Sequence, residues 1–201
     1  MLTPDLEDTM ATHTTPDRAA ERASTGSPTS SGTALRGAWL GMVASLVMAA
    51  FAMMAAATYQ GSGFFTPLYH IASTVISPGT MGTSMARAAD GNLFYVAFRP
   101  AVLGAVIHMM VGAMYGAVFA LVAPRLRLGG PTLALGGAVW GLVVFALSSF
   151  VALPLVAAVL GSRDQVADMA RMVGYPTFVA EHVLFGLALG LLLVRRPAER
   201  R

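Results

Sequence analysis

The sequence contains no cysteine and no lysine, and only 11% of its 201 residues are charged. The absence of cysteine excludes disulfides, thiolate metal sites and cysteine nucleophiles. A soluble domain usually carries about a quarter charged residues, whereas 56% of this chain is hydrophobic. All thirteen basic residues are arginines at the ends of apolar segments and in the tails, which does not indicate nucleic-acid binding. We expect an integral membrane protein that contacts the lipid bilayer.

Motifs for enzyme chemistry are also missing. The sequence has no paired carboxylates, nucleophile elbow, phosphate-binding glycine loop or zinc-protease motif, and its glycines lie at helical spacing in apolar runs. We therefore expect a protein that is not an enzyme.

Four apolar segments are each long enough to cross a bilayer, which takes about 17–25 helical residues. They cover residues 37–58, 101–123, 133–160 and 177–194. Pro154, inside the third, lacks a backbone N–H and is expected to kink or end that helix. We predict an all-α integral membrane protein whose four transmembrane helices lie in a domain over residues 35–196.

Two tails flank this domain in the prediction, over residues 1–34 and 197–201. The first is rich in Ser, Thr, Ala, Pro and acidic residues and lacks apolar periodicity, so we expect disorder. Arginine placement predicts that both termini are cytoplasmic and that the protein is a multi-pass protein of the cell (cytoplasmic) membrane. The arginines that carry this prediction are Arg36, Arg125, Arg127, Arg195, Arg196, Arg200 and Arg201.

The two outer connections are predicted to contain short interfacial helices. In residues 64–76, Thr66 can cap a helix that has Pro67 at its first position. In the third connection, Ser162 and Gln165 have the spacing of a capping box. Helices of about ten residues cannot span a bilayer, so we expect them at the outer surface or re-entering it.

The chain also contains an internal repeat. Gly-Ala-x-x-Gly-x-Val opens the first span at Gly37 and the third span at Gly137, and a proline precedes each of the other two spans. The pattern His-x-x-x-Gly-x-x-x-Gly then follows in both of those spans, beginning at His108 and at His182. We predict two pseudo-repeated helical hairpins in the same orientation.

This order of features resembles uncharacterised four-helix bacterial inner-membrane proteins of the YagU-like family. The resemblance lies in the Gly-rich first span, the His in the second, the Gly-opened third span that ends near Pro154, and the acidic Glu181 before His182 in the fourth. It covers residues 37–194 and implies the four-helix fold, with no established catalytic residues.

Glycines four residues apart share one helix face and let two helix backbones approach closely. We predict that these stripes serve chiefly in helix packing. The glycines in this prediction are Gly37, Gly41, Gly104, Gly112, Gly116, Gly137, Gly141, Gly186 and Gly190.

The matched histidines, His108 and His182, lie at similar depth on parallel helices, about 10 Å below the outer surface at 1.5 Å per residue. Three interpretations stay open. Each ring can tie helices together by a hydrogen bond, the pair can ligate one haem b, or the pair can hold copper together with Met110 and Met114.

Two further polar residues accompany the pair. Glu181 is the only formal charge among the four spans. We interpret it as an anion near the outer interface, stabilised by the helix dipole, with a proton relay to His182 as the alternative. His70 in the first outer helix is a candidate third imidazole.

Three classes of function are compatible with the sequence. The first is a structural or complex-forming subunit, as a homo-oligomer or within a larger membrane complex. The others are cofactor or metal binding by the histidine pair, and a proton-coupled transporter or channel that works as an oligomer.

Overall fold

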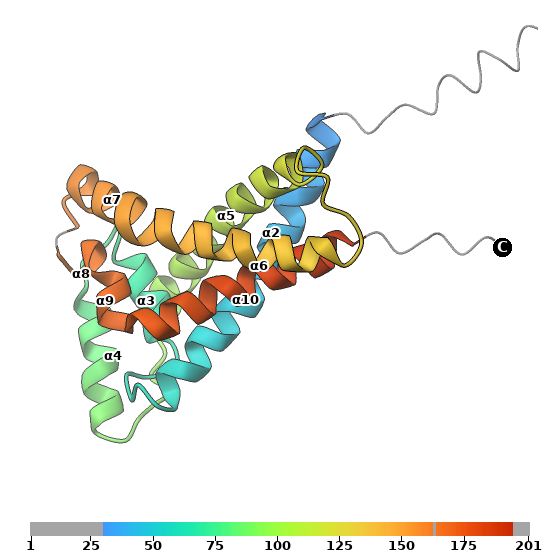
Figure 1. Ribbon diagram of the computed structural model, residues 1–201. Helices are drawn as coiled ribbons and strands as arrows, with labels where there is room; N and C mark the ends of the chain where they lie inside the picture. The colour runs from blue at the N-terminus through green and yellow to red at the C-terminus, as the bar shows by residue number, and fades with distance from the viewer. Residues whose placement is uncertain (1–29, 163, 195–201) are drawn as a thin grey trace, which may run out of the picture.

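The computed structural model describes residues 30–162 and 164–194, so residues 1–29 of the predicted N-terminal tail and the predicted tail over 197–201 lie outside the described residues. All regular structure in the described part is helical (Figure 1). Four helical segments are long and apolar enough to cross a membrane, which confirms the predicted all-helical fold with four candidate spans. These segments are α2 (Ser30–Ala57), α5 (Phe98–Val122), the continuous run Thr132–Leu160, and α10 (Tyr175–Leu193).

The first helix begins earlier than the sequence predicted. α2 starts at Ser30, so residues 30–34, which were assigned to the tail, belong to the helix. The difference arises because hydropathy marks only the apolar part of a helix, and a helix can continue into polar sequence beyond it.

The third span continues past Pro154, and its backbone hydrogen bonding changes from α-helical to π-helical just before this residue. It consists of α6 (Thr132–Leu147), one π-helical turn η1 (Ser148–Ala152) and α7 (Leu153–Leu160). The Leu153 N–H bonds to the carbonyl of Ser148, five residues earlier. A wider turn at this point accommodates a proline that cannot donate to the residue four positions before it. The helix ends instead at Gly161, whose φ of 66° is left-handed.

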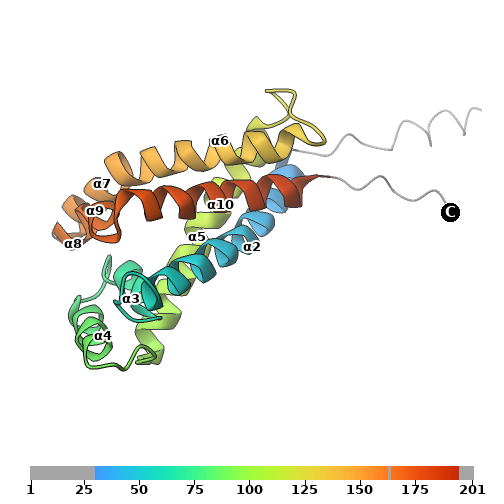
Figure 2. The same ribbon diagram turned by 60° about the horizontal axis from the view of Figure 1, so that its bottom comes forward.

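Two helix pairs form the body of the molecule, and glycines lie where the helices of each pair meet. α2 packs on α5, α6 packs on α10, and α2 also contacts α10 (Figure 2). A Cβ atom built on Gly112 would lie 2.6 Å from Ser45 Cβ, and one on Gly41 would overlap the Gly112 carbonyl oxygen. On the other pair, a Cβ on Gly186 would overlap the Gly137 carbonyl oxygen. These backbones are therefore as close as glycine allows.

Each remaining glycine of the predicted set also lies against a neighbouring backbone. Gly104 differs from the others because its neighbour is the carbonyl of Leu68 in a short helix and not a long one. The remaining neighbours all belong to long helices, in the pairs Gly37 with Gly116, Gly141 with His182, and Gly190 with Leu133.

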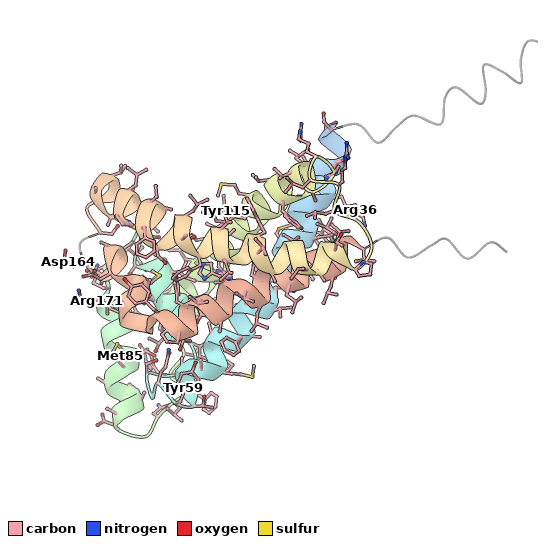
Figure 3. The ribbon with its side chains drawn as sticks, in the orientation of Figure 1. Arg36, Tyr59, Met85, Tyr115, Asp164 and Arg171 are labelled. Carbon is pink, nitrogen blue, oxygen red and sulfur yellow. The ribbon has the colours of Figure 1, made fainter. Side chains whose placement is uncertain are left out.

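The two ends of the molecule differ. α2 begins and α10 ends at the end where residues 123–131 connect α5 to α6; we call this the terminal end (Figure 1). The opposite end carries four short helices, here called the cap: α3 (Thr66–Ala72), α4 (Gly79–Ala89), α8 (Asp164–Ala167) and α9 (Met169–Val173). Arg36 lies at the terminal end, and Asp164 and Arg171 lie in the cap (Figure 3).

The side chains that were predicted to cap the short helices make other hydrogen bonds. Thr66 does not cap α3, because its hydroxyl instead contacts the Ser62 carbonyl and, at 2.8 Å, Ser84 Oγ. Ser162 does not form a capping box, because its hydroxyl donates to the Thr74 carbonyl at 2.7 Å. Both hydroxyls therefore join segments that are distant in sequence.

The packed apolar core lies toward the terminal end. Phe119 on α5 stacks on Trp140 of α6, with ring centroids 5.9 Å apart. Ala44 and Leu189 are fully buried beside them. The candidate site lies in the half of the molecule nearer the cap.

Candidate functional site

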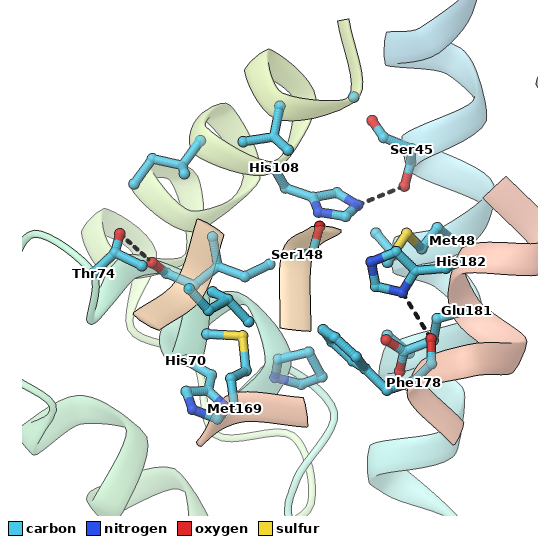
Figure 4. Close-up of a pocket in the computed structure, with 18 of the residues that line it drawn as sticks. Ser45, Met48, His70, Thr74, His108, Ser148, Met169, Phe178, Glu181 and His182 are labelled. Atoms are coloured by element: carbon cyan, nitrogen blue, oxygen red, sulfur yellow. Dashed lines mark hydrogen bonds between the residues drawn. The ribbon is translucent and has the colours of Figure 1, made fainter. Parts of the chain in front are cut away.

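A cavity of about 480 Å³ lies between the two helix pairs, on the cap side of the core (Figure 4). Its wall is formed by α2, α3, α5, α6, η1, α7, α9 and α10, and most lining side chains are apolar. This volume is within the range of about 300–1,000 Å³ that is typical of small-molecule sites. The polar side chains in the lining are Ser45, Gln60, His70, Thr74, His108, Tyr115, Ser148, Glu181 and His182.

Hydrogen bonds between the two outer connections join the halves of the cap. His70 Nε2 donates to the Gln165 carbonyl at 2.7 Å, and Gln60 Nε2 donates to the Val173 carbonyl at 2.8 Å. The Ser162 hydroxyl bond to Thr74 is a third such link. The cap therefore covers the cavity at this end of the molecule.

The mouth of the cavity lies between α5 and α7. Among the lining residues, Val111 and Met114 on α5 are 43% and 53% exposed, and Leu160 on α7 is 54% exposed. α5 and the α6–α7 helix separate toward the cap, as Figure 2 shows. Both are candidate membrane spans, so this opening faces the side of the bundle and not its end.

His108 joins two helices. Its Nε2 lies 2.9 Å from the backbone carbonyl oxygen of Ser45 on α2. A carbonyl only accepts, so Nε2 is the protonated nitrogen. The ring lines the cavity and is partly buried. This geometry agrees with the interpretation of His108 as a group that ties α5 to α2.

Within the described residues, the hydrogen bond of His182 stays on its own helix. Its Nδ1 donates to the carbonyl of Phe178, four residues earlier on the same helix, at 2.7 Å. The ring is 4% exposed and packs edge-on against the Phe178 ring, with centroids 4.5 Å apart. Figure 4 shows both histidine rings at one wall of the cavity. The structure thus brings the predicted pair together, with different hydrogen-bond roles.

Glu181 is buried within the protein. The sequence favoured a position near the outer surface, whereas the side chain is 5% exposed and lines the cavity on the second turn of α10. It makes no hydrogen bond or ion pair with any residue in the described part of the chain. α10 is covered here by the cap and by α2, a burial that periodicity alone does not reveal, and the dipole interpretation stays a prediction.

His70 is the third imidazole of the cavity lining, and the structure places it in the cap. It is 6% exposed, and burial lowers its pKa below 6.5, although the hydrogen bond to Gln165 opposes the shift. The neighbouring Tyr69 hydroxyl donates to the Tyr95 carbonyl at 3.0 Å and accepts the Ala97 N–H at 2.8 Å. Tyr69 therefore fixes α3 to the segment before α5, a role that sequence reasoning missed.

The methionines of the copper hypothesis differ in position, because Met114 lines the same cavity as His108 and His182 whereas Met110 does not. Met110 is 66% exposed and is not in the cavity lining, and Met114 is at the mouth. The reason is helical geometry: position 110 is two residues from His108, on another face of α5. Among the described residues, no group of three or more His, Asp or Glu side chains has the arrangement of a metal site.

Comparisons with protein-family models, curated proteins and solved structures give no match to this chain. The resemblance to the YagU-like family therefore stays a prediction from the residues quoted above.

Proposed function

We propose that this chain is a non-enzymatic, multi-pass membrane protein that binds an apolar small molecule in its intramembrane cavity. The observation that carries the proposal is the cavity itself, closed by the cap and open between α5 and α7. A ligand dissolved in the bilayer reaches such a mouth without crossing water.

We also propose the orientation and the duplication that the sequence predicts. Both termini are cytoplasmic, so the cap and the histidine-containing site lie toward the outer leaflet. The glycine contacts between α2 and α5 and between α6 and α10 support a pair of related hairpins. In this proposal the glycines hold each hairpin together, and the divergence of the hairpins leaves room for the ligand.

A complex-forming role is compatible with this proposal. Exposed large apolar side chains cover the outer faces of the spans, where lipid or a partner subunit can lie. Haem binding by His108 and His182 is the alternative. The absorption spectrum of the purified protein distinguishes haem binding from the proposed function. A Soret band that is lost in His108→Ala and His182→Ala would establish haem binding and overturn the proposal.

Filling the cavity tests the proposal. Val156 on α7 lines the cavity, whereas Val159 on the same helix is 73% exposed and outside the lining. We expect Val156→Trp to lower the affinity for dodecanol, measured in lipid nanodiscs, by about tenfold or more through steric exclusion. Val159→Trp is the matched control and is expected to bind as the wild type does. Equal binding by the two variants would overturn the proposal.

A further inference from the structure

The histidines of the cavity offer hydrogen-bond acceptors. Each ring donates from one nitrogen to a backbone carbonyl, and that carbonyl fixes which nitrogen carries the proton. A doubly protonated ring would place a charge without an acid partner in mainly apolar surroundings. Each ring therefore keeps one proton, and its other nitrogen is an acceptor. The acceptor atoms are Nδ1 of His70, Nδ1 of His108 and Nε2 of His182.

Glu181 adds a carboxyl group to this acceptor-rich wall. Its side chain is 95% removed from solvent and has no hydrogen bond or ion pair within the described residues. No arginine is among the described residues that line the cavity, and the chain contains no lysine. A buried carboxylate is costly unless a cation or several donors accompany it, and without them the group is held as the neutral acid. A cationic donor in the cavity would supply the partner that the ionised group needs.

We infer that the cavity binds a lipophilic amine, with the apolar body between α5 and α7 and the protonated amino group against Glu181 and the acceptor nitrogen of His182. This inference rests on the proposed function, because it names the ligand class of the same cavity. An ammonium group brings both the positive charge and the N–H donors that this wall lacks.

The same wall disfavours an aminophospholipid as the source of the ammonium. The headgroup of such a lipid also carries a phosphate, and a phosphate buried here would find no arginine or lysine in the described lining. A free amine with an apolar chain has no such unpaired charge. The inference therefore commits to an amine without an anionic group.

The test compares two probes of equal chain length, dodecylamine and dodecanol, on the full-length protein in phosphatidylcholine nanodiscs. We expect the wild type to bind dodecylamine about tenfold or more tighter than dodecanol, in excess of partition into empty discs. Glu181→Gln keeps the side-chain shape and removes the charge. It is expected to lose most of this preference.

A third probe keeps the test valid if Glu181→Gln does not fold. Dodecyltrimethylammonium has the charge but no N–H donor, so the wild type is expected to bind it about fivefold or more weakly than dodecylamine. Equal affinity for dodecylamine and dodecanol would overturn this inference and leave the proposed function standing. Binding of neither probe would overturn both. Displacement of dodecylamine by phosphatidylethanolamine would overturn the commitment to a free amine.

Discussion

The imidazole of His108 donates a hydrogen bond from Nε2 to the Ser45 backbone carbonyl and thereby joins α5 to α2 at 2.9 Å. The corresponding bond of His182 stays within α10. Two residues that occupy matching places in the sequence therefore differ in their hydrogen bonding. One contributes to helix association, and the other leaves its Nε2 side available to the cavity.

This difference predicts unequal stability effects. We expect His108→Leu to lower the free energy of unfolding by about 0.6–2 kcal/mol, the range measured for hydrogen bonds between membrane helices. His182→Leu removes only a bond to a carbonyl of its own helix and is expected to cost less. Unfolding in mixed micelles measures both, and a larger loss for His182→Leu would contradict the assignment.

The glycine contacts predict a second, larger effect. A methyl group on Gly41 or on Gly186 meets backbone atoms of the facing helix, which cannot move as a flexible side chain can. We expect Gly41→Ala and Gly186→Ala each to destabilise the protein by about 1–3 kcal/mol through overpacking.

Gly82 is the matched control for these substitutions. It lies in α4, and a Cβ there would have no atom within 4 Å. Gly82→Ala is expected to be neutral or to stabilise by up to about 1 kcal/mol, because glycine lowers helix stability. If all three substitutions have the same effect on thermal unfolding, the close approach of the backbones is not what stabilises the pairs.

Tyr69 provides a test of how the cap is attached. Tyr69→Phe removes a donor to Tyr95 and an acceptor for the Ala97 N–H. We expect a loss of about 1–3 kcal/mol, since the amide is left without its partner. Tyr95→Phe is the control, because the Tyr95 hydroxyl bonds to no described residue. Limited proteolysis of the 58–97 segment measures the effect, which is expected in Tyr69→Phe alone.

His70 makes stability depend on pH in a defined direction. Burial lowers its pKa below 6.5 in the folded protein, so the unfolded state takes up the proton first as the pH falls. The contribution of His70 is complete above pH 6.5 and is lost as the pH falls through the window below it. We expect His70→Gln to lose less stability than the wild type between about pH 7.5 and pH 5.5. Identical pH profiles of the unfolding temperature would show that His70 does not titrate in this window.

Hydropathy and helical spacing predicted the four spans because both depend on local composition. A short helix at Pro67 was also predicted, although it begins at Thr66, the residue that was predicted to cap it. α4 was not predicted, because its Gly, Thr, Ser and Ala residues give this segment a low mean hydropathy between two strongly apolar spans. The partners of Thr66 and Ser162 were missed because they lie in other segments, where a local capping rule does not reach.

The candidate site was predictable only in part. The His108 and His182 pattern placed both rings at one level, and the structure brings both into the cavity lining. The cavity itself arises from the divergence of α5 and α7 and from the cap above them. Neither follows from spacing along one helix, so the burial of Glu181 in the cavity was not predicted.

The most direct test of the central claim is photolabelling with dodecylamine that carries a diazirine in its chain. Leu153 and Val156 of α7 line the cavity, whereas Leu155 and Val159 of the same helix are 59% and 73% exposed outside it. The account predicts labelling of Leu153 and Val156 that an excess of unlabelled dodecylamine suppresses. Labelling that is strongest at Leu155 and Val159 and is not suppressed would show that the probe only samples the lipid-facing surface, and would contradict a ligand site in the cavity.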